Sequence, residues 1–296
     1  MIHILDLQFF SDETIAAFIV ETSEGPVLIE AGPYSVYKNL VRALKDRGYV
    51  PEDIKHVLLS HIHFDHAGAA WALAETGAKI YVHPFGYKHL LNPERLYNSA
   101  KRIYGDMMET LWGGMFPIPE SKLVAVENNA SITIGDKTFQ ALHTPGHASH
   151  HIAWKVGKNI FTGDVGGCKI GNGPVVPPCP PPDIDIGLWF DSLDIIQAQG
   201  PERLYLTHYG IVENISIHFH ELRHMLNEWG DWVRVSMERG ETAEEMTPKF
   251  RQYVENQLLE TGINDQMVAR YEAANPSWMS VTGLMRYWSG THSPRL

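Results

Sequence analysis

Short apolar segments alternate with polar turns along most of the chain, in the pattern of a layered α/β fold. The segment 57–59 is apolar at every position, which is typical of a strand buried on both faces of a sheet. A helical pattern over 34–47 precedes it and ends before Gly48 and Pro51, which are common stop signals. In the first part of the chain we predict strands at 2–7, 15–21, 27–30, 56–60 and 79–82, and helices at 34–47 and 67–75.

A second run of strands follows, and one of them repeats a pattern from the first half. An apolar strand, a hydroxyl residue and a histidine follow one another in both VLLSH at 57–61 and LYLTH at 204–208. We therefore expect two related halves that each deliver a histidine to the same edge of the fold. The strands predicted in this second half are 123–126, 131–134, 138–143, 152–156, 159–162 and 204–206.

The remaining segments have the spacing of helices. Helices are predicted at 214–238, 242–260 and 264–274, and no polar linker precedes them, so we expect a main domain over 1–212 and a helical extension over 213–296 packed onto it. The aromatic- and methionine-rich segment 84–119 is either a helical lid or part of the helix core. The amphipathic run 218–235 either packs on the main domain or forms the face of a homodimer.

The overall charge excludes one class of partner. The chain has 296 residues with 35 acidic and 24 basic side chains, which gives a formal net charge of -11. An acidic surface repels a polyphosphate backbone, whose binding normally needs a basic face. We therefore expect no nucleic-acid partner.

Three features of the sequence bear on where the protein is located in the cell. The longest apolar stretches, such as 15–20, are far shorter than the roughly 20 residues that a membrane helix needs. The start, MIHILDLQFF, lacks a basic region followed by an apolar stretch, so we expect no membrane contact and a cytoplasmic location. With only Cys168 and Cys179, a disulfide framework is excluded and a single disulfide is left open.

The strongest chemical signal is the sequence HIHFDH, which places His61, His63, Asp65 and His66 close together. Alternate residues of an extended segment point to the same side, and imidazole with carboxylate is the donor set that zinc and similar ions prefer. With 16 histidines in 296 residues, chance gives this spacing on the order of a few times per thousand. A cluster of merely solvated histidines is therefore the weaker explanation.

Three further donors occur where an apolar strand ends: His147, Asp164 and His208. Loops at strand ends are where functional groups collect. Each of these residues also has a structural explanation with about an even chance, which is a turn residue for His147, a cap for Asp164 and a core histidine for His208.

Taken together, these motifs resemble those of the metallo-beta-lactamase superfamily of metal-dependent hydrolases, from roughly residue 15 to residue 208. The ordered pattern His-x-His-x-Asp-His, then His, Asp and His, carries the resemblance. It implies a four-layer αββα sandwich with additional C-terminal helices and two divalent metal ions per chain. It also implies that the first metal is bound by His61, His63 and His147 and the second by Asp65, His66 and His208, with Asp164 bridging both.

Two features qualify this resemblance. Many relatives carry Asp where this chain has Glu30, so we expect Glu30 to hold one of the metal ligands in place. The loop 166–185 is rich in glycine and proline, and is either a rigid rim near the site or a plain connector.

The donor set leads to a hypothesis for the mechanism. Five imidazoles and two carboxylates suit zinc, iron, manganese or cobalt, and zinc is our first expectation. With two metals on the order of 3.5 to 4 Å apart, a bridging water becomes a hydroxide near neutral pH and attacks a substrate carbonyl. We expect Asp65 to carry the proton, whereas Tyr209 either donates to the oxyanion or is a packed aromatic.

Three functional hypotheses follow. The first is hydrolysis of small esters or lactones, which makes a small molecule the expected partner. The second is a thioester hydrolase of the glyoxalase II type, which needs a cationic pocket, and the C-terminal candidates for it are Arg270, Arg286 and Arg295. The third is a non-catalytic metal-binding scaffold, although such a protein usually loses ligands and this chain keeps all seven. The acidity disfavours a nuclease, and the expected lack of a secretory signal disfavours a periplasmic beta-lactamase.

Overall fold

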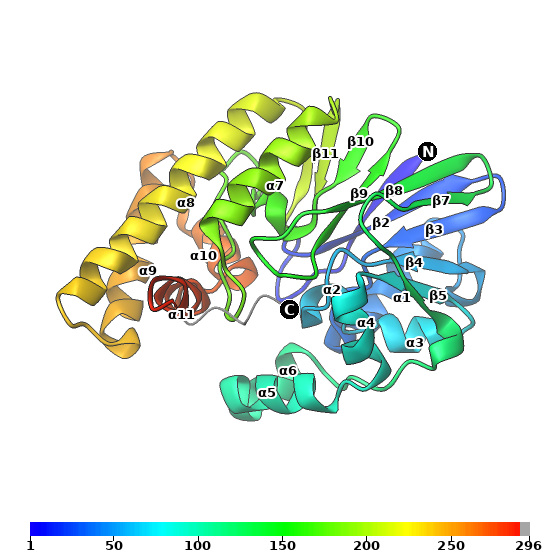
Figure 1. Ribbon diagram of the computed structural model, residues 1–296, viewed down its shortest axis with the longest axis horizontal. Coiled ribbons are helices and arrows are strands. Elements are labelled where there is room, and N and C mark those ends of the chain that lie inside the picture. Colours follow the sequence, from blue (N-terminus) through cyan, green and yellow to red (C-terminus); the bar gives the residue numbers. More distant parts are fainter. Residues whose placement is uncertain (291–296) are drawn as a thin grey trace.

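Two six-stranded sheets form the centre of the structure, which is a computed structural model that describes residues 1–290 (Figure 1). In both sheets the strands lie side by side in chain order. The first sheet contains β1 (Ile2–Asp6), β2 (Ala16–Thr22), β3 (Gly25–Ile29), β4 (His56–Leu58), β5 (Lys79–Val82) and β6 (Leu123–Ala125). The second contains β7 (Ser131–Ile134), β8 (Lys137–His143), β9 (Ile152–Val156), β10 (Asn159–Phe161), β11 (Arg203–Leu206) and β12 (Gly210–Val212).

The sheets pack face to face because successive side chains of a strand point to opposite faces of its sheet, and both faces are apolar. Along β2, Ile19 belongs to the cluster beneath the helices of the first half, whereas Phe18 belongs to the cluster between the sheets. There the ring of Phe18 packs 5.2 Å from that of Phe161 in β10. A third cluster joins the second sheet to the C-terminal helices. These three apolar layers separate four structural layers, which confirms the predicted αββα sandwich.

Backbone hydrogen bonds join the two sheets directly at one edge. The N–H of Ala16 donates to the carbonyl of Thr207 at 2.8 Å, and the N–H of Ile152 donates to the carbonyl of Ser60 at 2.7 Å. The ends of β4 and β11, which carry the repeated hydroxyl-histidine pattern, are thereby tied to the opposite sheet.

The helices of the first half cover the outer face of the first sheet and include the segment 84–119. They are α1 (Tyr37–Lys45), α2 (Phe64–Ala67), α3 (Ala70–Glu75), α4 (Pro84–Leu91), α5 (Glu94–Tyr104) and α6 (Met108–Leu111). Within 84–119, Leu90, Met108 and Trp112 are buried in the apolar cluster of this half. The segment therefore contributes to the core, which was one of its two predicted roles.

Helices α7 (Ile186–Ala198) and α8 (Ile215–Glu238) lie beside the second sheet (Figure 1). Beyond them follow α9 (Ala243–Glu260), α10 (Asp265–Ala274) and α11 (Ser277–Trp288). In the run 218–235 of α8, Phe219, Leu226 and Trp229 are buried against the second half of this same chain. Of the two predicted roles of that run, the structure shows packing within the chain. No helix among residues 1–290 is long and apolar enough to cross a membrane.

The structure adds elements that the sequence pattern did not predict. Helices α7 and α11 and strand β12 are new, and the predicted helix 67–75 is divided between α2 and α3. Short 3-10 turns connect several elements, at Tyr34–Val36, Pro51–Asp53, Gly105–Met107, Glu120–Lys122 and Gly163–Gly166. The predicted helix over 34–47 accordingly begins with one such turn.

Candidate metal centre

The HIHFDH motif lies where β4 passes into α2. His61 and His63 lie on the extended connection, and His63 is the residue immediately before α2. Asp65 and His66 lie in α2 itself, so the expectation of one extended segment for the whole motif was wrong. Because α2 begins at Phe64 and a helix turns about 100° per residue, Asp65 and His66 point in other directions than His63.

The other three donors follow strands β8, β10 and β11 of the second sheet: His147, Asp164 and His208. Gly146, just before His147, has a φ of 126°, a conformation that other residues rarely adopt. A Cβ at Gly146 would overlap the backbone of Trp189 in α7. Glycine therefore lets the loop that carries His147 approach α7 closely.

The first group of donor atoms consists of three imidazole nitrogens. His63 Nδ1 lies 2.9 Å from His61 Nε2 and 3.1 Å from His147 Nε2. His61 and His147 are fully buried, whereas His63 is partly exposed. Three ring nitrogens thus converge on one point at the end of the sandwich.

The second group consists of two imidazoles and two carboxylates from Asp65, His66, Asp164 and His208. Asp164 Oδ1 lies 2.9 Å from His66 Nε2 and 3.4 Å from His208 Nε2. Asp65 Oδ2 lies 3.3 Å from His208 Nε2 and 3.6 Å from His66 Nε2. The other oxygen of Asp164, Oδ2, lies 3.2 Å from His147 Nε2 of the first group. Asp164 therefore stands between the two groups.

The donor atoms of this centre fit a metal ion. His147 donates from Nδ1 to the carbonyl of Pro178 at 2.9 Å, and His208 donates from Nδ1 to the carbonyl of Thr14 at 2.8 Å. Because a carbonyl only accepts and burial lowers the pKa of His147 to about 4, the neutral His147 ring keeps a lone pair on Nε2, and that lone pair faces Asp164 Oδ2 at 3.2 Å. Two electron-rich atoms at this separation need a cation between them. A divalent metal ion suits this set of imidazoles and carboxylates.

Glu30 lies behind the second group, where the sequence led us to expect it. Its carboxylate contacts His66 Nδ1 at 3.2 Å, and it accepts hydrogen bonds from the Ser60 N–H at 3.3 Å and the Thr207 hydroxyl at 3.5 Å. The Ser60 hydroxyl also lies 2.9 Å from His61 Nδ1. Ser60 and Thr207 are the hydroxyl residues of the repeated pattern, to which the sequence reasoning had given no role. Both halves thus meet at one buried carboxylate.

The two groups differ in the pKa values of their side chains. Burial, with a small contribution from neighbouring histidines, holds the pKa of His61 well below its ordinary value and lowers that of His147 to about 4. Burial alone would also lower the pKa of His66, but the surrounding carboxylates, Asp164 above all, raise it well above its ordinary value. Burial raises the pKa of the Asp65 carboxyl, yet His66 and His208 lower it by more, to about 2. The first group is therefore neutral, whereas the second combines cationic and anionic groups.

Two buried histidines that the sequence reasoning did not single out lie beside the first group. The ring of His151 lies 5.2 Å from that of His61, and its Nδ1 meets the Thr144 hydroxyl at 2.9 Å. The ring of His150 lies 6.0 Å from that of His63. Neither residue offers an atom to the two converging groups. The sequence HASHH at 147–151 was the signal that could have drawn attention to them.

Tyr209 lies away from the donor groups. Its side chain packs against the apolar cluster between the two sheets. Burial raises the pKa of its hydroxyl, with smaller contributions from Asp6 and Glu13. Across residues 1–290 the structure gives it no contact with the seven donors, so it favours the packed aromatic over the proton donor.

Tyr104, at the end of α5, is the tyrosine that the structure brings toward the site. Burial raises the pKa of its hydroxyl, and the nearby charge of Asp65 raises it further. The same side chain reaches α11, where its hydroxyl lies 3.4 Å from Met279 Sδ and its ring 5.7 Å from that of Trp278. The segment 84–119 therefore meets the C-terminal helices close to Asp65.

The structure also shows where two of the three candidate arginines and both cysteines lie. Arg270 forms ion pairs with Asp12 at 2.8 Å and Glu13 at 3.4 Å, which ties α10 to the loop after β1. Arg286 is partly buried near the end of α11, and Arg295 lies outside the described residues. The two cysteines, Cys168 and Cys179, are buried free thiols, which answers the open question of a disulfide.

Comparisons with known proteins agree with this architecture. A family model described as the metallo-beta-lactamase superfamily matches residues 12–208. A metallo-beta-lactamase fold-containing protein of Sulfurisphaera tokodaii is 30% identical over 203 residues, which cover 67% of this chain and 76% of that protein. An N-acyl homoserine lactonase of Bacillus sp is 26% identical over 163 residues, which cover 47% of this chain and 57% of the lactonase.

A structural likeness extends over the C-terminal helices as well. A metallo-beta-lactamase family protein from Thermus thermophilus matches with a TM-score of 0.70 at 17% identity, over 98% of this chain and 93% of that one. This likeness concerns the fold alone. The match of the family model over 12–208, which spans all seven candidate ligands, shows that the chain belongs to the metallo-beta-lactamase superfamily.

Proposed function

We propose that this protein is a hydrolase that binds two divalent metal ions, zinc by first expectation, and cleaves small carboxylic esters or lactones. The observation that carries the proposal is the pair of adjoining donor groups, with Asp164 in contact with both. A single structural ion needs one closed set of about four ligands, whereas this chain supplies seven donors in two sets. Similarity to an N-acyl homoserine lactonase supports the choice of acyl substrates.

The side chains of the centre have separate parts in this reaction. Bound divalent ions supply Lewis acidity, which polarises a carbonyl and makes water a stronger nucleophile near neutral pH. His61, His63 and His147 would hold one ion. The other would be held by Asp65, His66 and His208, with Asp164 reaching both.

Asp65 is suited to move the proton. Its side chain is 19% exposed, whereas Asp164 is 4% exposed, so Asp65 is the carboxylate of the centre that a substrate can reach. Its low pKa, about 2, keeps it ionised at neutral pH and able to accept a proton at Oδ1 or Oδ2. In the proposed reaction it accepts the proton of the attacking water and returns it to the leaving oxygen.

The thioesterase alternative of the glyoxalase II type is weakened at one of its candidate residues. It needs a cationic pocket, and Arg270, one of its candidates, is already paired with two carboxylates. A thioester therefore serves as a comparison substrate in the test below.

The test combines metal content with a substrate panel. Purified full-length chain is analysed for metals by mass spectrometry and assayed on lactones, aryl esters, a thioester and a beta-lactam, before and after treatment with a chelator. We expect two ions per chain and hydrolysis of esters or lactones that the chelator abolishes and added zinc restores. The variant His147→Ala should lose one ion, and His220→Ala, which changes an exposed histidine on α8, should keep both.

Two outcomes would contradict the proposal. Protein that contains no metal, is inactive and cannot be reconstituted would favour the non-catalytic scaffold. Metal-dependent turnover of the thioester alone would replace the ester and lactone assignment.

A further inference from the structure

A proline-rich segment holds one ligand of the first group. Residues 177–182 have the sequence PPCPPP, and we call them the proline loop. Because proline fixes φ and has no N–H, the loop is stiff and Cys179 carries its only backbone donor. The carbonyl of Pro178 accepts the hydrogen bond from His147 Nδ1 at 2.9 Å. The position of this carbonyl therefore sets the direction in which His147 presents Nε2.

Side chains from the C-terminal helices hold the chain on both sides of that carbonyl. Asn275, at the end of α10, donates from Nδ2 to the carbonyl of Pro177 at 3.0 Å. Ser280, in α11, accepts from the Cys179 N–H at 3.4 Å and donates to Asn275 Oδ1 at 3.2 Å. Asn275, Ser280 and Cys179 are all buried, so water does not readily replace these bonds. The two side chains form one unit with the loop.

The backbone of α11 also lies directly against the loop. A Cβ at Gly283 would overlap the carbonyl of Cys179, so this helix approaches the loop as closely as glycine allows. One helix earlier, the Tyr271 hydroxyl donates to the carbonyl of Pro174 at 2.6 Å and accepts from the Ile170 N–H at 3.0 Å. Helices α10 and α11 thus contact both the proline loop and the segment that precedes it.

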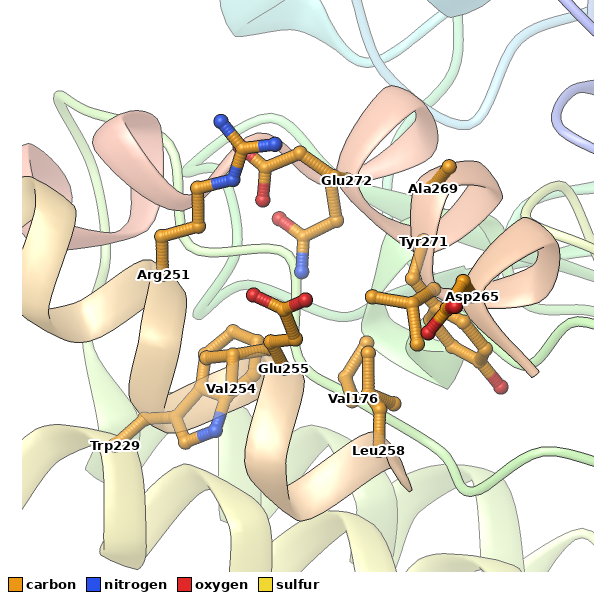
Figure 2. A pocket seen from close by; sticks show the side chains of 12 residues that line it. Val176, Trp229, Arg251, Val254, Glu255, Leu258, Asp265, Ala269, Tyr271 and Glu272 are labelled. Carbon is orange, nitrogen blue, oxygen red and sulfur yellow. The ribbon is translucent and has the colours of Figure 1, made fainter. Parts of the chain in front are cut away.

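Packing beside α10 is incomplete, and Asn275 itself borders the gap. A cavity of about 120 Å³ lies between α9 and α10, and Val176 and Tyr271 are among the residues that line it (Figure 2). Glu255 and Glu272 border the same space (Figure 2). The polar contacts of Asn275 and Ser280 therefore add to the buried apolar packing around Cys179 in holding the loop.

We propose that Asn275 and Ser280 are positioning residues for the first ligand group. By fixing the proline loop on either side of Pro178, they orient His147 and so strengthen binding of the ion that this group would hold. The C-terminal extension is then part of the machinery of the centre although it supplies no ligand. This inference rests on the proposed metal centre, and its test includes a measurement that needs no metal.

The first measurement is metal affinity of the full-length chain. Zinc is titrated in competition with a chromophoric chelator, and cobalt is added in a parallel sample to record its absorption spectrum. We expect Asn275→Ala to bind the first-group ion about 3- to 10-fold more weakly and to shift the cobalt spectrum, because outer partners of a metal ligand tune its affinity.

The matched control is Asn264→Ala, at the other end of α10. Asn264 caps this helix by accepting the Met267 N–H at 3.0 Å, and among residues 1–290 it makes no hydrogen bond to the proline loop. We expect it to lower the melting temperature to a similar extent while leaving zinc affinity and the cobalt spectrum unchanged. Equal loss of affinity in both variants would mean that α10 acts only through overall stability, and the proposal would be withdrawn.

The second measurement follows the Nδ1 proton of His147 by NMR in metal-free protein. In the wild type this proton is buried in its bond to Pro178 and should exchange slowly with water. We expect Asn275→Ala and Ser280→Ala to exchange it several-fold faster, and Asn264→Ala to leave it unchanged. Unchanged exchange in both loop variants would overturn the proposal.

The two measurements separate the possible failures. If the wild type binds no zinc, the proposed function fails, and the exchange rate still decides whether Asn275 and Ser280 orient His147. If Asn275→Ala does not fold, Ser280→Ala alone is judged by the same affinity and exchange criteria.

Discussion

The two donor groups of the centre offer different kinds of ligand atom. The first offers three imidazoles whose pKa values are lowered, mainly by burial, so they are neutral lone-pair donors at physiological pH. The second adds the carboxylates of Asp65 and Asp164, with Glu30 behind them. Charge therefore dominates the second group, whereas the first depends on how accurately its neutral rings are aimed.

The supports of the two groups differ in the same way. Glu30 and the Thr14 carbonyl, which hold His66 and His208, belong to the sandwich itself. His147 of the first group is held by the proline loop, which is attached to helices near the end of the chain. The neutral group is thus held partly from outside the sandwich, through His147, whereas His66 and His208 of the charged group are supported from within it.

The largest expected effect comes from removing the negative charge of Asp164, which contacts both groups. Asp164→Asn keeps the shape of the side chain and removes its charge, so both groups lose a partner. We expect both ions to bind more weakly by more than roughly 100-fold, beyond the usual effect of losing an outer partner. Metal content after desalting measures this, and Asp191→Asn on the exposed face of α7 is the control. Retention of both ions in Asp164→Asn would show that the groups are independent.

A smaller effect should divide the two groups. Glu30→Gln removes the charge behind His66 and leaves the first group untouched. We expect the second ion to bind about 10- to 100-fold more weakly and the first ion to bind as before. Stepwise removal of metal with increasing chelator distinguishes the two ions. Equal weakening of both would contradict the separate roles assigned to the supports.

A change outside both groups should alter substrate binding only. Tyr104→Ala removes the contact between α5 and α11 near Asp65. If the segment 84–119 covers the site, KM for bulky esters should rise about tenfold while both ions stay bound. Loss of metal and of melting temperature together would instead assign the segment to the core alone.

The smallest effect concerns stability beneath the turn that carries Asp164. His218 is buried in α8 and donates from Nε2 to the carbonyl of Gly166 at 2.8 Å. Burial lowers its pKa to about 4, below the value of about 6.5 in the unfolded chain. The unfolded state therefore takes up a proton first, and the stability that the neutral ring provides is lost as pH falls from about 6.5 to about 4.

The measurement for His218 is urea unfolding at two pH values. Between pH 7 and pH 5 this ring should account for about 1–2 kcal/mol of the loss of unfolding free energy, and His218→Gln should abolish that part. His220→Gln, at an exposed position, serves as the control. Identical pH dependence in wild type and His218→Gln would show that the ring does not govern this behaviour.

The convergence of the seven candidate donors could be predicted because each signal was local. The HIHFDH motif occupies consecutive residues, and His147, Asp164 and His208 follow apolar strands that are recognisable on their own. The direction of each side chain could not be predicted in the same way. It depended on α2 beginning at Phe64 and, for Tyr209, on how the chain continues after His208.

The two missed helices show why other parts escaped prediction. Helix α7 buries Trp189 and Leu193 but also exposes Leu188 and Ile195, so it lacks the single apolar stripe that marks a helix in sequence. Helix α11 contains Ser280 and Gly283, which are poor helix formers. The place of α11 follows from its contacts with the proline loop, far away along the chain, and that of α7 from hydrogen bonds to the carbonyls of Pro145 and Val165. No local pattern records these contacts.

The backbone bonds between the sheets have a consequence for the order of folding. His61 to His66 come from the first half and His147, Asp164 and His208 from the second, and the bonds from Ala16 to Thr207 and from Ile152 to Ser60 close the distance between them. Such contacts between remote segments form late, since a long loop must close before they repay its entropy. A nascent chain that has completed only its first half holds the HIHFDH donors without their partners. Binding of the two proposed ions would then be the last step of maturation, and its rate would report the docking of the two halves.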